Sequence, residues 1–197
     1  EDVQIEGIER LSRLESLEIE RCFADVNQLP LMPNLKRLAL AKDDYHVDGL
    51  AHFPNLEKLK ILSAKSIKLE KLHQLKVLDV SNCVYVESFN FFEDLPRLET
   101  LSLSDLNNDP EGNLIQLEAL KQLTNLKRLS LRETTLKSLD GIEALQSLEY
   151  LDLNDTGVRD VKVLNSLKNL KEAYLVVSQQ VNSLEMKNQL DRPEIAR

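Results

Sequence analysis

One short pattern of apolar residues is repeated along the whole chain. The pattern is Leu-x-x-Leu-x-Leu, in which isoleucine, valine or alanine sometimes replaces a leucine. Eight copies, which start 19 to 28 residues apart, begin at Leu14, Leu35, Leu56, Leu75, Leu98, Leu126, Leu148 and Leu170. Self-similarity at this period is typical of chains that stack similar short units, and it constrains the fold more than any other feature of the sequence.

Each copy predicts one short strand followed by a return. The Leu-x-Leu part alternates apolar and polar residues, as a half-buried strand requires. A single strand of this kind cannot bury its own face, so the copies must stack side by side in a parallel sheet. Downstream of the strands, apolar residues recur about every third position, for example at Leu136, Leu139, Ile142 and Leu145. That spacing predicts a short helical or 3₁₀ return.

In both the register and the period of its repeats, the sequence resembles the leucine-rich-repeat family over essentially the full length of the chain. This resemblance implies an α/β fold, a horseshoe-shaped solenoid of about eight repeats. Its parallel sheet would form the concave face and its short helical or 3₁₀ returns the convex face. We expect a single domain over residues 1–197, with an N-terminal cap at 1–10, repeats at 11–178 and a C-terminal cap or tail at 179–197.

Two subclasses of the family are similar to parts of the chain. The period near 22 residues between Leu126 and Leu167 resembles the subclass that includes regulators of type-one protein phosphatase and the bacterial internalins. The stretches 14–22 and 75–83 resemble the sensor regions of nucleotide-binding immune receptors. Neither resemblance identifies a partner.

The two cysteines fit the repeat as structural residues. Cys22 and Cys83 both occupy the ninth position of the motif, where a small polar group or a thiol can satisfy backbone groups in the turn. Three strand spacings would separate them by about 14 Å, well beyond the roughly 7 Å between the Cα atoms of a disulfide. We therefore expect no disulfide between them.

The charge and hydrophobicity of the chain exclude some classes of partner. The formal net charge is -8, with 33 Asp and Glu against 25 Lys and Arg, which argues against a general nucleic-acid binder. No apolar run approaches the roughly 18 residues of a membrane helix, so no membrane insertion is expected. The chain has no basic-then-apolar leader, which favours a cytoplasmic location, although secretion stays open if a leader has been removed.

The sequence contains no recognisable pattern of catalytic or metal-binding residues, so we predict no catalytic residue, no metal site and no cofactor. His46 lies among acidic residues at 43–48 but without a defined ligand spacing. The stretch from Asp105 begins like a calcium loop, yet it has Pro110 where the loop needs glycine and Gln116 where it needs glutamate. We interpret residues 107–113 as a protruding loop.

Polar residues between the strand leucines are the natural contact surface. The candidate partner-binding residues are Arg37, Lys58, Lys60, Leu62, Asp79, Arg128, Arg132, Tyr150, Asp152, Asn154 and Tyr174. Two groups stand out: cations around a small apolar spot near Leu62, and two tyrosines on adjacent strands, which are frequent interface anchors. The alternatives are a merely solvated face, cover of Tyr174 by the C-terminal tail, or binding at the 107–113 loop or the acidic N-terminal end.

The family resemblance implies a non-catalytic module that binds a protein partner on its concave face. One alternative is the ligand-sensing region of a larger immune-receptor-type protein, or of another multidomain enzyme or switch. A second alternative is a secreted bacterial effector or an internalin-like adhesin.

Overall fold

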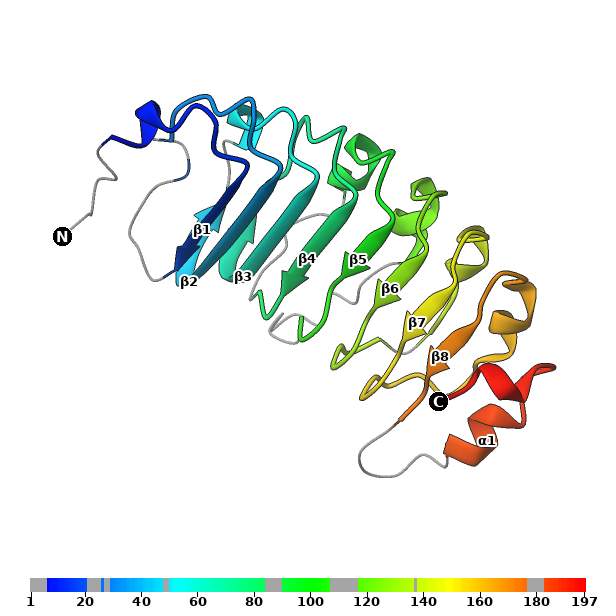
Figure 1. Ribbon diagram of the computed structural model, residues 1–197. Helices are drawn as coiled ribbons and strands as arrows, with labels where there is room; N and C mark the ends of the chain where they lie inside the picture. Colours follow the sequence, from blue (N-terminus) through cyan, green and yellow to red (C-terminus); the bar gives the residue numbers. More distant parts are fainter. Residues whose placement is uncertain are drawn as a thin grey trace.

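The protein forms one curved parallel sheet of eight strands, arranged in the order of the sequence (Figure 1). The computed structural model describes residues 7–20, 26, 29–47, 50–83, 90–106, 117–136, 138–176 and 183–197. The strands are β1 (Ser16–Glu20), β2 (Arg37–Val47), β3 (Lys58–Ile67), β4 (Val77–Ser81), β5 (Thr100–Ser102), β6 (Arg128–Ser130), β7 (Tyr150–Asp152) and β8 (Glu172–Tyr174). The predicted copies therefore each provide one strand.

The strands pair at equivalent motif positions. The second leucine of each copy pairs with that of the next, from Leu17 with Leu38 to Leu151 with Ala173 in the last copy. This register places every outward-pointing side chain beside its counterpart in the neighbouring repeat. The sequence motif alone is therefore enough to tell which side chains are neighbours across the sheet.

Short helical returns lie behind the sheet, on the convex face (Figure 1). They are the 3₁₀ turns η3 (Leu50–His52), η4 (Asn90–Asp94), η5 (Leu117–Gln122), η6 (Ile142–Ala144) and η7 (Lys162–Ser166), and a further 3₁₀ turn, η1 (Ile8–Arg10), precedes β1. A tight 3₁₀ turn suits a return in which apolar residues recur every third position. The predicted leucine-rich-repeat solenoid is confirmed.

Repeats two and three differ from the simple strand-and-return pattern. β2 and β3 continue beyond the length of the other strands. After an irregularity in register, a second stretch of parallel pairing ends with Val47 opposite Ile67. Both side chains are buried, and both are β-branched residues that favour extended backbone. The convex side of these two repeats is therefore partly strand.

The hydrophobic core fills the space between the sheet and the returns. Motif leucines of the inner repeats, such as Leu78, Leu101 and Leu129, are essentially inaccessible to solvent. Leu14 and Leu17 are only half-buried, because β1 pairs with a strand on one side alone. Burial of this continuous core is the main stabilising contribution in a repeat fold.

Side chains in the turns tie neighbouring repeats together. Asparagine amides donate to a carbonyl of the preceding repeat: Asn34 to Ser12, Asn55 to Pro33, Asn125 to Pro96 and Asn169 to Gln146, at 2.7 to 2.9 Å. At the ninth motif position, the hydroxyls of Thr134 and Thr156 donate to the carbonyls of Leu131 and Leu153. These bonds satisfy backbone acceptors that the turns leave unpaired.

The C-terminal segment packs on the last repeat. It contains α1 (Ser183–Lys187) and η8 (Pro193–Ile195), and it buries Met186 and Leu190. Ala196 forms a β-bridge with Ala173, and the Arg197 amide donates to the Ala173 carbonyl at 2.8 Å. In the described residues, no helix is long and apolar enough to cross a membrane.

Candidate functional site

Outward-pointing side chains form three rows across the concave face, at the third, fifth and seventh motif positions. The first row runs from Ser16 through Arg37, Lys58, Val77, Thr100, Arg128 and Tyr150 to Glu172. The second runs from Glu18 through Ala39, Lys60, Asp79, Ser102, Ser130 and Asp152 to Tyr174. In the third row lie Glu20, Ala41, Leu62, Ser81, Ser104, Arg132, Asn154 and Val176. All the predicted site residues lie in these rows.

Three of the predicted residues form an aromatic stack over β6, β7 and β8. The Arg128 guanidinium lies 4.0 Å from the centroid of the Tyr150 ring. The rings of Tyr150 and Tyr174 lie 5.3 Å apart between centroids, tilted by 42°. Such cation–π and aromatic contacts hold the rings in defined orientations. Partial burial, followed by the negative charge of Asp152, raises the pKa of Tyr150.

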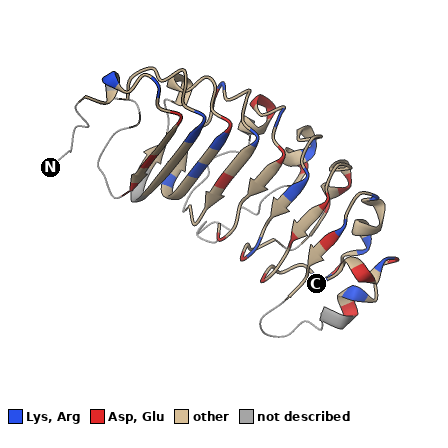
Figure 2. Ribbon diagram, in the orientation of Figure 1, with Lys and Arg blue, Asp and Glu red and all other residues tan. Residues whose placement is uncertain are grey.

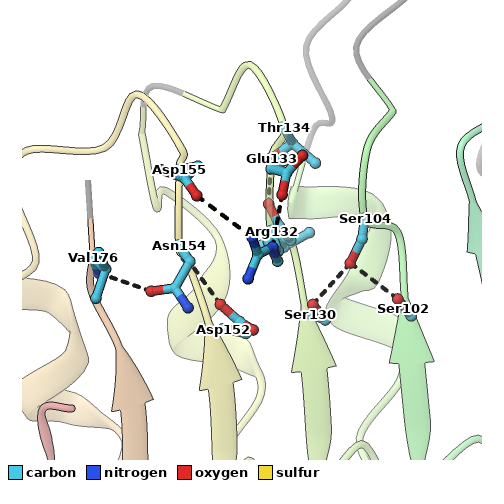
Figure 3. A network of polar contacts seen from close by, with 11 residues as sticks. Ser102, Ser104, Ser130, Arg132, Glu133, Thr134, Asp152, Asn154, Asp155 and Val176 are labelled. Atoms are coloured by element: carbon cyan, nitrogen blue, oxygen red, sulfur yellow. Dashed lines mark hydrogen bonds and ion pairs between the residues drawn. The ribbon is translucent and has the colours of Figure 1, made fainter. Parts of the chain in front are cut away.

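Beside the aromatic stack, polar side chains fix one another and the backbone (Figure 3). Asp152 Oδ1 accepts a hydrogen bond from the Asn154 amide at 2.9 Å, and Asn154 Oδ1 accepts one from the Val176 amide at 2.8 Å. Arg132 donates from Nε to Glu133 at 2.8 Å and lies 3.8 Å from Asp155. The hydrogen bond and the charge of Glu133 raise the pKa of Arg132. The Arg132 charge is therefore already matched within the chain.

The middle of the face is a neutral strip of hydroxyl groups. Ser81, Ser102, Ser104 and Ser130 are linked by hydroxyl contacts of 2.9 to 3.2 Å, and Ser81 also donates to Asp79 (Figure 3 draws the last three serines). These short side chains lie between the longer side chains at the two ends of the face. The predicted residues thus form two groups rather than one site.

The second group is a basic patch on β2 and β3, which we define as Arg37, Lys58 and Lys60. Arg37 lies opposite Lys58 in the first row, and Lys60 lies opposite Ala39 in the second. Ala41 and Leu62, both half-buried, are paired in the third row. The three cations are exposed, and the small side chains lie between and beside them.

Comparison with known proteins supports the repeat architecture described above. The family model for leucine-rich repeats, in two copies, matches residues 124–166, which include β6 and β7. The chain is a leucine-rich-repeat protein. The matched region carries the most regular copies of the motif and includes Arg128 and Tyr150 of the aromatic stack.

Solved leucine-rich-repeat structures share this fold at low sequence identity. An internalin of Listeria monocytogenes is 22% identical with a TM-score of 0.69, and the match covers 92% of this chain and 54% of that one. A leucine-rich-repeat protein of Leptospira interrogans is 21% identical with a TM-score of 0.71, over 96% of this chain and 50% of that one. In the Toll–Spatzle complex of Drosophila, the matching chain is 17% identical with a TM-score of 0.76, over 91% of this chain and 25% of that one.

A curated relative is similar in sequence. A putative disease resistance protein of Arabidopsis thaliana is 31% identical over 133 residues, which is 64% of this leucine-rich-repeat protein and 10% of the relative. The chain thus spans about a tenth of the length of that relative and about half of the two bacterial structures.

The sulfur and imidazole groups of the described residues have structural contacts. The Cys83 thiol contacts the carbonyls of Ile61 and Ser81, and burial raises its pKa to about 11, so it is a poor nucleophile at neutral pH. His46 Nδ1 lies 2.6 Å from Ser66 Oγ, and His52 Nδ1 lies 2.8 Å from the Leu29 carbonyl oxygen. In the described ranges, no three His, Cys, Asp or Glu side chains gather as a metal site would need. Cys22 and the 107–113 loop lie outside the described residues.

A ladder of alternating charge at the second motif position, which we call the rim ladder, was not predicted from the sequence. Its members are Glu15, Lys36, Glu57, Lys76, Glu99, Lys127, Glu149 and Lys171, and successive members are joined by backbone hydrogen bonds. Each lysine forms an ion pair with the glutamate of the preceding repeat, at 2.7 to 3.1 Å. The signal was present in the sequence as strict alternation at one motif position.

Proposed function

We propose that this leucine-rich-repeat protein is a non-catalytic recognition domain that binds a protein partner on its concave face. The aromatic stack carries this proposal. Tyr150 and Tyr174 are half-buried, so each exposes part of its ring to a partner, and Arg128 holds the first ring in place. Anchors that are ordered before binding lose little conformational entropy when a partner arrives.

The surroundings of the stack also support an interface. Val176, at the end of the third row, is 51% exposed, so the described C-terminal segment 183–197 leaves this edge of the face open. Asp152 and Asn154 add polar groups that are held in place by backbone amides. An apolar and aromatic centre with an ordered polar border is typical of protein interfaces.

The test is a comparison of partner capture by two variants. Tyr150→Ala with Tyr174→Ala removes the stack, whereas Leu31→Ala removes an apolar side chain that is 67% exposed outside the three rows. Both proteins are immobilised and incubated with an extract of the cells that produce the chain, and bound proteins are identified by mass spectrometry. We expect the double variant to lose at least nine-tenths of a partner that the Leu31→Ala variant retains.

Circular dichroism and thermal unfolding establish that both variants are folded before capture. Equal capture by the wild-type protein and the tyrosine double variant would contradict binding at the concave face. A partner lost from the Leu31→Ala variant instead would place the interface at the turn before β2.

The curated relative favours a second candidate function, the recognition region of a larger receptor-type protein. The supporting observation is the 31% identity to a putative disease resistance protein of which this chain spans only a tenth. The test is to determine the complete reading frame. A nucleotide-binding segment in the same frame would support this candidate, and a short frame that ends near Arg197 would exclude it.

A further inference from the structure

The three cations of the basic patch form no ion pair with a described residue, although the charge of Lys58 contributes a little to the lowered pKa of the neighbouring Glu57. No hydrogen bond or ion pair within the described part of the chain involves the side chains of Arg37, Lys58 or Lys60. The lysines of the rim ladder, which lie at the second motif position of every other repeat, are each paired with a glutamate at 3.1 Å or less. Among the described residues, the rim lysines are thus paired, whereas three cations lie together on the concave face without an ion pair.

Acidic residues limit the basic patch on both sides. Glu18 and Glu20 lie on β1, and Asp79 lies on β4, in the same rows (Figure 2 shows blue positions on β2 and β3 between red ones). The chain as a whole carries a net charge of -8. A long polyanion would meet repulsion on either side of the patch, whereas a short acidic segment would meet only the cations.

The spacing of the cations suits an extended peptide. Arg37 and Lys60 lie on adjacent strands and two residues apart in register, a diagonal of about 7 to 8 Å in a sheet. In an extended chain, side chains two residues apart point the same way and lie about 7 Å from each other. Two carboxylates in an acidic-x-acidic arrangement would therefore reach both cations at once.

The small side chains beside the cations supply the second contact. Ala39, Ala41 and Leu62 are half-buried and form a low apolar floor next to the longer cationic side chains. An aliphatic side chain of the partner would lie on this floor while neighbouring carboxylates met the cations.

We propose that the basic patch binds a short, extended, carboxylate-rich segment of the protein partner, with an aliphatic residue of that segment on the Ala39, Ala41 and Leu62 floor. This inference rests on the proposed function and assigns the chemistry of the partner at one end of the face. The aromatic stack would contact a different part of the same partner, four strands away.

The probe for the test is a fluorescein-labelled eight-residue peptide of sequence Glu-Ser-Glu-Ser-Leu-Ser-Glu-Ser, whose glutamates and leucine all point to the same side of an extended chain. Its matched control replaces every glutamate with glutamine. Binding is followed by fluorescence anisotropy at 150 mM salt with the wild-type protein. We expect the glutamate peptide to bind at least tenfold more tightly than the glutamine peptide, and its affinity to fall as salt is raised.

Two variants with the same change in net charge test the location. Lys58→Glu with Lys60→Glu reverses the patch, and Lys121→Glu with Lys162→Glu reverses two exposed lysines on the convex returns η5 and η7. We expect at least a tenfold loss of peptide affinity from the first variant and less than a twofold loss from the second. Equal losses would overturn the proposal, because the effect would then reflect net charge alone.

Further outcomes would also overturn the inference. Equal binding of the glutamate and glutamine peptides would exclude carboxylate recognition. Tighter, patch-dependent binding of a single-stranded oligonucleotide would assign the patch to nucleic acid instead. In the capture experiment, loss of the partner with Tyr150→Ala and Tyr174→Ala but not with Lys58→Glu and Lys60→Glu would end this inference and leave the proposed function standing.

Discussion

At the scale of single residues, Gly141 lies where the backbone of one repeat passes close to that of the preceding repeat. Its φ is +95°, and a Cβ at this position would lie 3.0 Å from the Glu118 amide nitrogen and 3.2 Å from the Leu117 carbonyl carbon. These neighbours are backbone atoms of η5, which cannot move without displacing the whole turn. Glycine is therefore required here for both conformation and space.

Substitution of Gly141 tests this argument against a matched glycine. Gly7 also has a positive φ, +84°, but has nothing within 4 Å of an added Cβ. We expect Gly7→Ala to lower the free energy of unfolding by about 1 kcal/mol, and Gly141→Ala to lower it by about 3 kcal/mol, because steric overlap adds to the backbone strain. Urea unfolding of both variants measures the difference. Equal effects would show that the close approach contributes nothing.

The eighth motif position shows what the sequence could and could not predict at this scale. Ser63, Asn82, Asp105, Glu133 and Asp155 all have φ between 54° and 59°. Asparagine and aspartate adopt this conformation readily, so three of the five agree with local preference. Serine and glutamate do not, and only the repetition of the turn from one copy to the next identifies their conformation.

At the scale of elements, the strands and the three outward rows could be predicted because one leucine register determines both. The aromatic stack could not, since the contact of Arg128 with Tyr150 depends on side-chain rotamers across two strands. The pairing of Arg132 with Glu133 and Asp155 was missed for the same reason, and it leaves Arg132 less available to a partner than Lys58 or Lys60. The continuation of β2 and β3 was also missed, because the motif says nothing about residues behind the sheet.

Arg192 is the side chain that joins the C-terminal segment to the last return. Its guanidinium donates to the carbonyls of Leu167 at 2.7 Å and Leu170 at 3.0 Å, and contacts that of Lys168 at 3.5 Å. The Leu167 carbonyl also accepts from the Leu170 amide at 3.1 Å, whereas the Lys168 carbonyl occupies the motif position of Gln146, which accepts from Asn169 of the following repeat. One planar side chain thus takes the place of the asparagine donor that a further repeat would supply, and it also bonds the two neighbouring carbonyls.

We expect Arg192→Ala to lower the free energy of unfolding by about 2 kcal/mol, because charge-assisted hydrogen bonds to half-buried carbonyls are lost. Arg192→Lys should recover only part of this, since an ammonium group cannot reproduce the planar fork. Arg97→Ala, at an exposed arginine whose side chain bonds that of Gln74 and no other among the described residues, is the control and should change stability by less than about 0.5 kcal/mol. Guanidinium unfolding measures all three, and equal effects of Arg192→Ala and Arg97→Ala would argue against a capping role.

At the scale of the whole molecule, the rim ladder runs along all eight repeats and pairs them two by two through ion pairs. Glu57 has its pKa lowered first by the hydrogen bond and charge of Lys76, and further by Lys36 on the other side. Glu149 has its pKa lowered in the same way by Lys171 and then by Lys127. These two glutamates therefore respond to the lysines of both neighbouring repeats, so this part of the ladder is more than a set of isolated pairs.

Exchanging the two residues of one ion pair tests whether the rim charges act as isolated pairs or as a ladder. Glu57→Lys combined with Lys76→Glu keeps the local pair and the net charge, but places like charges beside Lys36 and Glu99. Isolated pairs predict no change in stability, whereas a ladder predicts a lower Tm, by a few degrees, at pH 7 and low salt. The loss should shrink at high salt, where exposed charges are screened.

Measuring Tm at low pH provides an internal control for this exchange. A glutamate whose pKa is lowered on folding adds stability that is present above its unfolded pKa, near 4.5, and is lost as the pH falls through the folded value. The difference in Tm between the wild-type protein and the exchanged variant should therefore be constant from pH 7 to pH 5 and shrink once the rim glutamates are protonated, because only the repulsion between Lys36 and the lysine introduced at position 57 then remains. High salt should remove that remainder. A difference that persists unchanged in acid and at high salt would have to come from packing, and the alternation along the rim would then have no electrostatic role in joining the repeats.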